Sequence, residues 1–251
     1  MNETTRASPY HQIKKIEDVT YELDVREAID REILEFGFFE LSTAAALSRL
    51  CLPGSTVLDI GANIGAHTFH LAKKVGETGR VIAFEPTTYA FTKLYRNMLL
   101  NNFNNVRLER MALSDTSGVM ELAFNSSWRS EGSELPPVQE AMLLMTLDEY
   151  MRRYAVGRVD LIKLDVDGYE VKILRGGKET IAKYRPHIVT ELCAYALQQQ
   201  GETVMNLLHF LSALGYRFFG EQTYELLEDL PSIAASVPAD SSINVLAIHP
   251  V

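Results

Sequence analysis

Two segments of the sequence combine glycine and acidic residues in a way that suits a nucleoside ligand. The first is the turn at residues 59–65 (DIGANIG), which follows a predicted strand and opens a predicted helix. Its glycines let the backbone bend sharply and lie against a ligand with no Cβ in between. The second is Glu85, followed by Pro86, at the end of the next predicted strand. Because an acidic residue at this distance from the turn can accept hydrogen bonds from ribose hydroxyls, the two segments predict a nucleoside site.

The residues of the turn indicate which nucleoside this is. A dinucleotide fingerprint has glycine at its first, third and sixth positions, where this chain has Gly61, Asn63 and Ala66. The sequence thus lacks the glycine that lets backbone approach a pyrophosphate, and it contains no GxxxxGKS/T phosphate loop. Asp59 would repel a phosphate and attract a cation. These features favour S-adenosylmethionine, which carries no phosphate; the alternative is a turn that only joins strand to helix.

A third segment places ionisable residues in an apolar strand. Residues 163–170 read KLDVDGYE. Burying so many charges is costly unless they pair with one another or serve a site. Alternation puts Lys163 and Asp165 on one side of the strand and Asp167 at its carboxyl end. One interpretation makes Asp165 and Asp167 catalytic; the other makes Lys163 a salt-bridge partner and Asp167 a helix cap.

Two further residues are candidates for the same crevice. Glu191, late in another predicted strand, would form an oxygen-rich pocket with Asp165 and Asp167 that suits a hard cation such as Mg²⁺. A metal-free site in which a carboxylate orients or deprotonates an acceptor hydroxyl is an equal alternative. His67, in the first turn of the helix after the glycines, is a candidate general base; the alternative is an ordinary structural histidine.

The elements that position these residues alternate between buried strands and helices. Near-continuous apolar strands separated by helices pair in parallel, with helices on both faces. We therefore expect an α/β protein with a doubly wound, mostly parallel sheet. The predicted strands cover residues 56–60, 80–84, 106–111, 161–165, 188–192, 216–219 and 243–248, and the predicted helices cover residues 64–74, 89–101, 169–174 and 203–214.

The chain divides into an N-terminal extension, residues 1–50, and a single domain, residues 51–251. The first 20 residues are polar and are expected to be loosely held, and helical spacing of apolar residues predicts a partly helical extension after them. The strand–helix alternation breaks at residues 114–145, which hold two possible short strands, residues 119–124 and 142–145. Between them lies a loop, residues 125–137, that carries the only tryptophan. We expect it to form either a lid over the substrate or a solvent-covered hairpin.

Composition and charge exclude several classes of protein. Hydrophobic residues make up 47% and charged residues 23%, which is typical of a folded soluble protein. The formal charge of −9, with no basic stripe, disfavours a nucleic-acid partner. No apolar run approaches the ~20 residues of a membrane span, and the first residues do not resemble a signal peptide. Cys51 and Cys193 are expected to be free thiols in the cytoplasm; the oligomeric state stays open.

Four segments resemble the FkbM family of S-adenosylmethionine-dependent methyltransferases: DIGANIGAH, AFEP, ALSD and IKLDVDGYEVKILRGG. The resemblance runs from about residue 53 to residue 192, with a looser match in the final INVLAIHP. It implies the Rossmann-like, seven-stranded class I methyltransferase fold. It also implies methylation of hydroxyl groups on sugars, polyketides and related small molecules. The chain departs from the family pattern at Asp167, where glutamate is common.

The resemblance further implies roles for individual residues. Glu85 would hold the ribose, and Met111 and Ala112 would pack near adenine, unless these two are plain core residues. Ser114 or Asp115 would reach the adenine amino group. Asp59 would anchor either the turn or the ammonium group of the cofactor. From the residues and the resemblance together, the predicted cofactor-binding residues are Asp59, Gly61, Asn63, Gly65, Glu85, Pro86, Met111, Ala112, Ser114 and Asp165.

Two other functions are compatible with a nucleoside site. One is a binding module without catalysis, and the other is a methyltransferase acting on nitrogen. Amino-methylating enzymes of nucleic acids use a (D/N/S)PP(Y/F/W) tetrapeptide, and Pro136 and Pro137 lack its flanking residues. The sequence therefore predicts an O-methyltransferase that transfers a methyl group from S-adenosylmethionine to a small-molecule hydroxyl acceptor.

Overall fold

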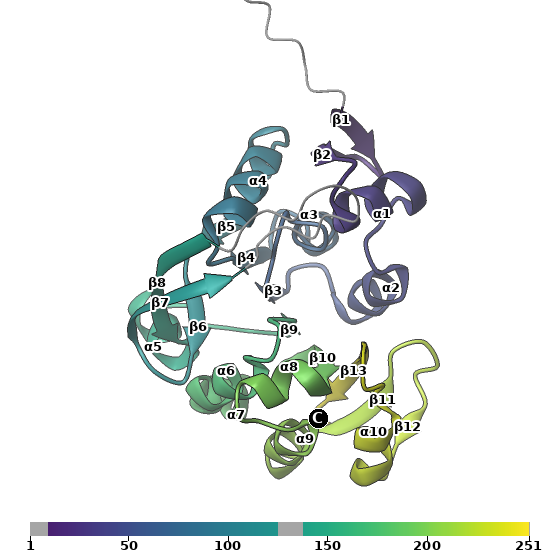
Figure 1. Ribbon diagram of the computed structural model, residues 1–251, viewed down its shortest axis with the longest axis vertical. Helices are drawn as coiled ribbons and strands as arrows, with labels where there is room; N and C mark the ends of the chain where they lie inside the picture. Colours follow the sequence, from purple (N-terminus) through teal and green to yellow (C-terminus); the bar gives the residue numbers. More distant parts are fainter. Residues whose placement is uncertain (1–9, 125–137, 251) are drawn as a thin grey trace, which may run out of the picture.

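A central sheet runs through the computed structural model, which describes residues 10–124 and 138–250 (Figure 1). The order of its strands is β12-β11-β13-β10-β9-β3-β4-β5. Pairings among β10, β9, β3, β4 and β5 are parallel, whereas β13 pairs antiparallel with β10 and β11. The strands are β3 (Thr56–Ile60), β4 (Arg80–Phe84), β5 (Val106–Glu109), β9 (Leu161–Leu164), β10 (His187–Cys193), β11 (Arg217–Gly220), β12 (Leu226–Leu227) and β13 (Ser242–Ile248).

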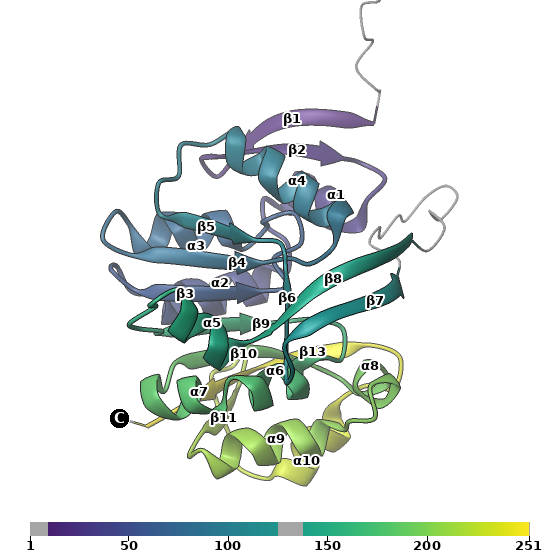
Figure 2. The same cartoon turned by 90° about the vertical axis from the view of Figure 1, so that its left-hand side faces the viewer.

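This order confirms the predicted doubly wound, mostly parallel sheet. The chain starts at the centre with β3, moves outward to β5, and then crosses to β9 on the other side of β3. Figure 2 shows the strands one below another, from β5 down to β13. All seven predicted strands are present, and the short β12 adds an eighth at one edge. Ligands of open α/β sheets bind where the strand order reverses, which here is between β3 and β9.

Alternation along the strands sends side chains into two separate cores. Leu58 and Ile82 belong to the core beneath α5, α6, α7 and α9, whereas their neighbours Val57 and Val81 belong to the core beneath α2 and α3. Helices therefore cover both faces of the sheet, as predicted. These helices are α2 (Leu41–Leu50), α3 (Thr68–Val75), α5 (Leu147–Arg153), α6 (Glu170–Gly176), α7 (Lys178–Tyr184) and α9 (Val204–Ala213).

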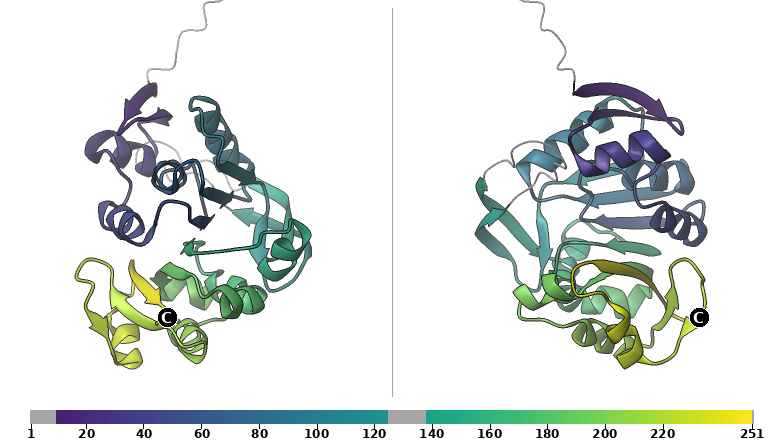
Figure 3. Two further views of the ribbon diagram at one scale, coloured as in Figure 1. Left: turned by 180° about the vertical axis from the view of Figure 1, so that it is seen from behind. Right: turned by 45° about the vertical axis from the view of Figure 1, so that its right-hand side comes forward.

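The N-terminal extension is more ordered than the sequence predicts. Strands β1 (His11–Ile16) and β2 (Val19–Asp24) pair as an antiparallel hairpin, followed by α1 (Ala28–Phe36) (Figure 3, right). The expectation that the first 20 residues are loosely held is therefore wrong for residues 11–20. The reason is the alternation of β2, whose apolar residues are buried against α1 and α4 (Thr88–Leu99).

A second, three-stranded sheet stands beside the central one. Its strands β6 (Ala112–Ser114), β8 (Val138–Thr146) and β7 (Gly118–Phe124) lie in that order, and β7 and β8 form an antiparallel hairpin. The chain therefore leaves the central sheet after Glu109, earlier than predicted. The predicted lid, residues 125–137, lies outside the described residues. The remaining short helices are α8 (Ala194–Gln199) and α10 (Leu230–Ser236).

Two predictions from composition concern the cysteines and the membrane spans. Cys51 and Cys193 are buried free thiols. Within the part of the chain that the structure describes, every helix is too short or too polar to cross a membrane.

Candidate active site

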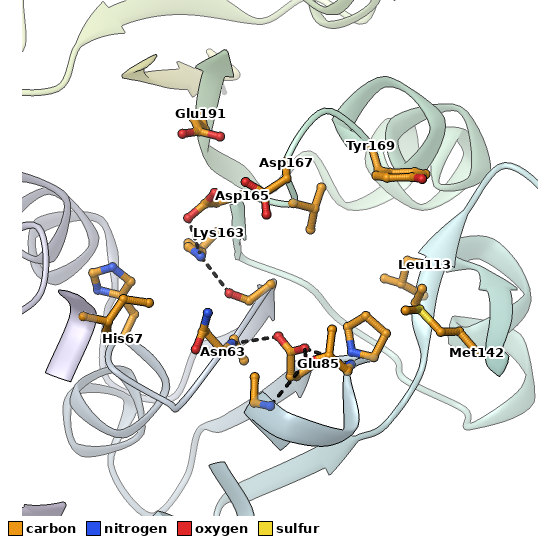
Figure 4. A pocket seen from close by; sticks show the side chains of 18 of the residues that line it. Asn63, His67, Glu85, Leu113, Met142, Lys163, Asp165, Asp167, Tyr169 and Glu191 are labelled. Atoms are coloured by element: carbon orange, nitrogen blue, oxygen red, sulfur yellow. Dashed lines mark hydrogen bonds and ion pairs between the residues drawn. The ribbon is translucent and has the colours of Figure 1, made fainter. Parts of the chain in front are cut away.

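A cavity of about 560 Å³ opens at the carboxyl ends of β3, β4, β9 and β10. Its wall contains Gly61 and Asn63 from the glycine turn, Glu85 and Pro86 from the end of β4, and the loop after β9 (Figure 4). Residues far apart in the sequence thus meet at the place where the strand order reverses. The predicted site residues on this wall are Gly61, Asn63, His67, Glu85, Pro86, Ala112, Ser114, Asp165, Asp167 and Glu191.

Gly61 is required where the turn passes the end of β9. Its φ is +85°, and a Cβ built there would lie 1.8 Å from the carbonyl oxygen of Asp165. The turn is also tied to the neighbouring strand, because the N–H groups of Gly61 and Ala62 both donate to the carbonyl oxygen of Phe84, at 3.0 Å. Only glycine can therefore bring this backbone so close to the strand that carries Asp165.

Three predicted cofactor residues lie behind the cavity wall. Asp59 is fully buried and accepts a hydrogen bond from the hydroxyl of Thr68 at 2.5 Å, which anchors the turn to α3. A Cβ on Gly65 would collide with the ring of Phe69, so this glycine serves helix packing. Met111 is a core residue. This position agrees with the alternative that Met111 is a plain core residue, and its packing near adenine stays a prediction.

Glu85 is held in place by the two segments that flank it. Its Oε2 accepts the N–H of Asn63 at 3.0 Å, and its Oε1 accepts the N–H of Thr87 at 2.9 Å and the hydroxyl of Thr87 at 2.6 Å. The side chain is buried, and burial raises the pKa of Glu85 above its ordinary value. The carboxylate thus joins the glycine turn to the start of α4, facing the cavity.

Lys163, which is buried, and Asp165, which is partly exposed, form an ion pair that borders the cavity. Nζ of Lys163 lies 3.0 Å from Oδ2 of Asp165 and donates to the carbonyl oxygen of Gly61, also at 3.0 Å. Burial opposes the charged form of Lys163, but the carboxylates of Asp165 and Asp59 outweigh it and raise the pKa of the ammonium. The salt-bridge interpretation of Lys163 is confirmed, and the same pair borders the cavity.

The loop after β9 is shaped by two left-handed residues and a buried carboxyl. Asp167 has φ +52° and Gly168 has φ +98°. Oε1 of Glu170 accepts the N–H groups of Val166 at 3.0 Å and Gly168 at 3.3 Å. Its Oε2 is buried without a partner among the described residues, and burial raises the pKa of Glu170 to about 7. Glu170 therefore fixes the loop that presents Asp165 and Asp167 to the cavity.

Glu191 faces the same cavity from β10. Burial and the nearby charge of Asp165 raise its pKa to about 8. Asp165, Asp167 and Glu191 thus come together as predicted (Figure 4). Across residues 10–124 and 138–250, however, no group of three or more His, Cys, Asp or Glu side chains is arranged to hold a metal ion. The geometry gives the expected Mg²⁺ site no support.

The opposite wall of the cavity is apolar. Leu113 follows Ala112 in β6, and Met120, Met142 and Leu144 come from the β7–β8 hairpin. The hairpin is therefore part of the site and not merely a solvent-covered element. Sequence reasoning missed these residues, since alternating apolar residues in a hairpin do not reveal which face meets a ligand.

His67 and Glu40 close the cavity toward the N-terminal extension. Nε2 of His67 lies 3.8 Å from Oε2 of Glu40, and both residues line the cavity. Glu40 carries no signal in the sequence, because it lies in the connection between two predicted helical segments. It is the main charged residue of the site that sequence reasoning missed.

The sheet order, the glycine turn and the buried Glu85 define a class: nucleoside-binding α/β proteins, to which the S-adenosylmethionine-dependent methyltransferases belong. Residues 59–218 match the model of the methyltransferase FkbM domain. The chain therefore belongs to the FkbM methyltransferase family, which confirms the resemblance seen in its motifs.

Curated relatives agree with this family, and a solved structure agrees with the fold. Methyltransferase sdnD of Sordaria araneosa is 26% identical over 199 residues, covering 65% of this chain and 76% of the relative. The 2-O-methyltransferase NoeI of Sinorhizobium fredii is 26% identical over 204 residues, covering 74% and 78%. The crystal structure of methyltransferase FkbM from Methylobacillus flagellatus superposes with a TM-score of 0.50 and 15% identity, covering 79% of this chain and 44% of that chain. This last likeness concerns the fold alone.

Proposed function

We propose that this methyltransferase transfers a methyl group from S-adenosylmethionine to a hydroxyl group of a small molecule. The observation that carries the proposal is that one cavity is lined by the carboxylate of Glu85, which would bind ribose, and by acidic and histidine side chains that would meet the acceptor. A relative whose name states 2-O-methylation, NoeI, supports oxygen as the acceptor atom.

The cavity suggests how the cofactor would lie. Glu85 would accept a ribose hydroxyl, and the apolar wall at Leu113, Met142 and Leu144 would cover adenine, with Ser114 near its amino group. The methionine end would then follow the glycine turn at Gly61 and Asn63. When bound, S-adenosylmethionine supplies an electrophilic methyl on a sulfonium, and the chain's own groups must orient the acceptor and take up its proton.

The acceptor would occupy the end of the cavity lined by acidic side chains and a histidine. Its hydroxyl would lie among the candidate catalytic residues Asp165, Asp167, Glu191 and His67. The absence of a nucleic-acid partner and the cytoplasmic location both stay predictions from composition. A non-catalytic binding module and a methyltransferase acting on nitrogen are the alternatives that the experiment must separate.

The test is methyl transfer from radiolabelled S-adenosylmethionine to a panel of acceptors. The panel contains methyl glycosides of neutral hexoses, 6-deoxyhexoses, hexuronates and amino sugars, together with simple phenols and aliphatic alcohols. We expect label in an acid-stable ether on one class of hydroxyl. Cofactor binding in calorimetry with no transfer to the panel or to a metabolite extract would favour the binding module, and label on amine nitrogen would contradict O-methylation.

A further inference from the structure

His67 carries a buried nitrogen that the protein leaves unused. The residue stands at the start of α3 with 5% of its side chain exposed, and it lines the cavity. Among the described residues its Nε2 has no hydrogen-bond partner. Buried polar atoms are nearly always paired, so an unpaired one on a residue that lines a cavity indicates a place for a polar group of a ligand.

Glu40 lies opposite this nitrogen and is itself held in an uncommon conformation. It precedes α2 with φ +47°, in the left-handed region, and its N–H donates to the carboxylate of Glu32 at 2.7 Å. Glutamate adopts this region only where its surroundings require it. Oε2 of Glu40 is 3.8 Å from Nε2 of His67, too far for a direct hydrogen bond and wide enough for a hydroxyl to contact both atoms.

Glu40 has the negative charge that a partner of a protonated histidine needs. Burial would raise the pKa of Glu40, but the neighbouring His67 and the charge of Lys163 outweigh burial and lower it. Glu40 is therefore a carboxylate at neutral pH. A carboxylate at this distance can stabilise the positive charge that His67 would carry after it takes up a proton.

Asp165 is a weaker candidate for the proton acceptor. Its Oδ2 is paired at 3.0 Å with the buried Nζ of Lys163. This oxygen is already engaged by a donor, which leaves less of the carboxylate free to accept a hydroxyl proton. Paired with Lys163, Asp165 is better placed to orient the acceptor and the Gly61 turn than to remove a proton.

Glu40 also connects the cavity to a second hollow. This hollow, of about 950 Å³, is bounded by the start of α2, the segment after β11 and the start of β13. Its walls include Thr43, whose hydroxyl donates to Glu221 at 2.6 Å and accepts from Asn244 at 3.0 Å. An acceptor that extends into this hollow places a hydroxyl beside Glu40 and His67.

From these contacts we propose that His67 is the general base of methyl transfer and that Glu40, from the N-terminal extension, is its positioning residue. The inference rests on the proposed function. Nε2 of His67 takes the hydroxyl proton while the acceptor oxygen bonds to the methyl carbon. The carbon–sulfur bond breaks, and its electron pair stays on sulfur as a neutral thioether. Glu40 stabilises the imidazolium, which returns its proton to water when product leaves.

Other ionisable groups face His67 and must be considered in a pH profile. Lys163 from β9 and Asp165 from the loop after it line the same cavity, Asp59 of β3 lies behind its wall, and His70 lies one turn further along α3. Burial, with the neighbouring His67 and Lys73, lowers the pKa of His70 to about 4. His70 is therefore neutral throughout the range in which activity would be measured.

The experiment compares His67→Gln and Glu40→Gln with two matched controls. His70→Gln removes the other histidine of α3, which packs against Phe38 with ring centroids 4.6 Å apart. Glu35→Gln removes an exposed carboxylate from α1 of the same extension. We measure kcat against pH with the first acceptor methylated in the panel, the Kd of S-adenosylmethionine by calorimetry, and thermal unfolding.

We expect His67→Gln to lower kcat by ~10²- to 10⁴-fold and to abolish the fall of activity at acid pH. Glu40→Gln should lower kcat by about 10-fold or more and move that fall to lower pH, because the imidazolium loses its carboxylate. In both variants the Kd of S-adenosylmethionine should stay within about threefold, and the controls should keep kcat within about twofold.

Three outcomes would overturn the inference. If His67→Gln keeps a near-normal kcat and the wild-type fall of activity at acid pH, His67 is not the general base. Parallel losses of kcat and cofactor affinity in both variants assign the pair to cofactor binding instead. If His67→Gln does not fold, Glu40→Gln alone decides: a fall of activity at the same acid pH as in the wild type rejects the roles proposed for both residues. A wild-type protein that methylates no hydroxyl contradicts the proposed function itself, whereas normal wild-type transfer with unaffected variants contradicts only this inference.

Discussion

Replacing Glu85 by glutamine tests the cofactor site most directly. A carboxylate has about four positions that accept hydrogen bonds, and three of them are taken by the N–H of Asn63 and the N–H and hydroxyl of Thr87. One position therefore remains for a ribose hydroxyl. Because a hydrogen bond to a charged group contributes ~1.5–3 kcal/mol, its loss should raise the Kd of S-adenosylmethionine by roughly 10- to 100-fold.

Glutamine also places an amide N–H₂ group against one of the two backbone donors. The variant should therefore be somewhat less stable, so urea unfolding must show that it is folded at the temperature of the calorimetric titration. The matched control is Glu109→Gln, which alters a buried glutamate at the end of the neighbouring β5 whose partners are Tyr150 and Arg107. We expect the control to bind S-adenosylmethionine with the wild-type Kd.

The pH dependence of binding gives a second check on Glu85. Burial raises the pKa of Glu85, so its carboxyl becomes protonated at a higher pH than an exposed glutamate does. Affinity of the wild type should therefore fall at mildly acid pH, and that fall should be absent from Glu85→Gln. A folded variant that binds S-adenosylmethionine with unchanged Kd would show that Glu85 does not bind the cofactor.

Three further predictions concern the loops and charges around the cavity. Gly61→Ala should lower the free energy of unfolding in urea by about 3 kcal/mol or more, because the new Cβ meets the Asp165 carbonyl oxygen. Gly157→Ala, where a Cβ meets nothing within 4 Å, should change it by less than about 0.5 kcal/mol; equal effects would refute the close-approach argument. Burial raises the pKa of Glu170 from 4.5 to about 7, so its ionisation opposes folding as pH rises through this window. As pH rises from 4.5 to 7, the free energy of unfolding of the wild type minus that of Glu170→Gln should therefore fall by about 3 kcal/mol. A difference that stays constant with pH would contradict a buried carboxyl at Glu170. Since Lys163 already pairs with Asp165, methyl transfer should be indifferent to a chelator; loss of activity that added Mg²⁺ restores would contradict this.

Local patterns in the sequence were sufficient to predict the central sheet. Short apolar runs such as residues 56–60 and 80–84 are strands because their side chains are buried on both faces, and the helices between them require parallel pairing. The glycine turn and Glu85 were also predictable, because each belongs to a strand end whose place at the sheet edge follows from the order of elements. The same reasoning failed for residues 11–24, where the alternation of a short hairpin is weak beside many charged residues.

The role of Lys163 shows where the sequence leaves alternatives open. In the sequence, an ion pair of this lysine belongs to one of two interpretations, and the other makes Asp165 and Asp167 catalytic. Only the packed sheet places Nζ of Lys163 at 3.0 Å from both Oδ2 of Asp165 and the carbonyl oxygen of Gly61. The choice depends on the parallel register of β3 and β9, which pairs Asp59 with Lys163 across the two strands.

The sequence by itself determined the class of fold, the glycine turn and the carboxylates at the strand ends, because these follow from local periodicity and from the order of the elements. The tertiary structure alone decided that Met111 turns into the core, that the β7–β8 hairpin covers the cavity, and that Glu40 meets His67. Each of these depends on how elements remote in sequence pack against one another. The distance between two such side chains is set by the shapes of everything between them, and no local pattern of residues encodes it.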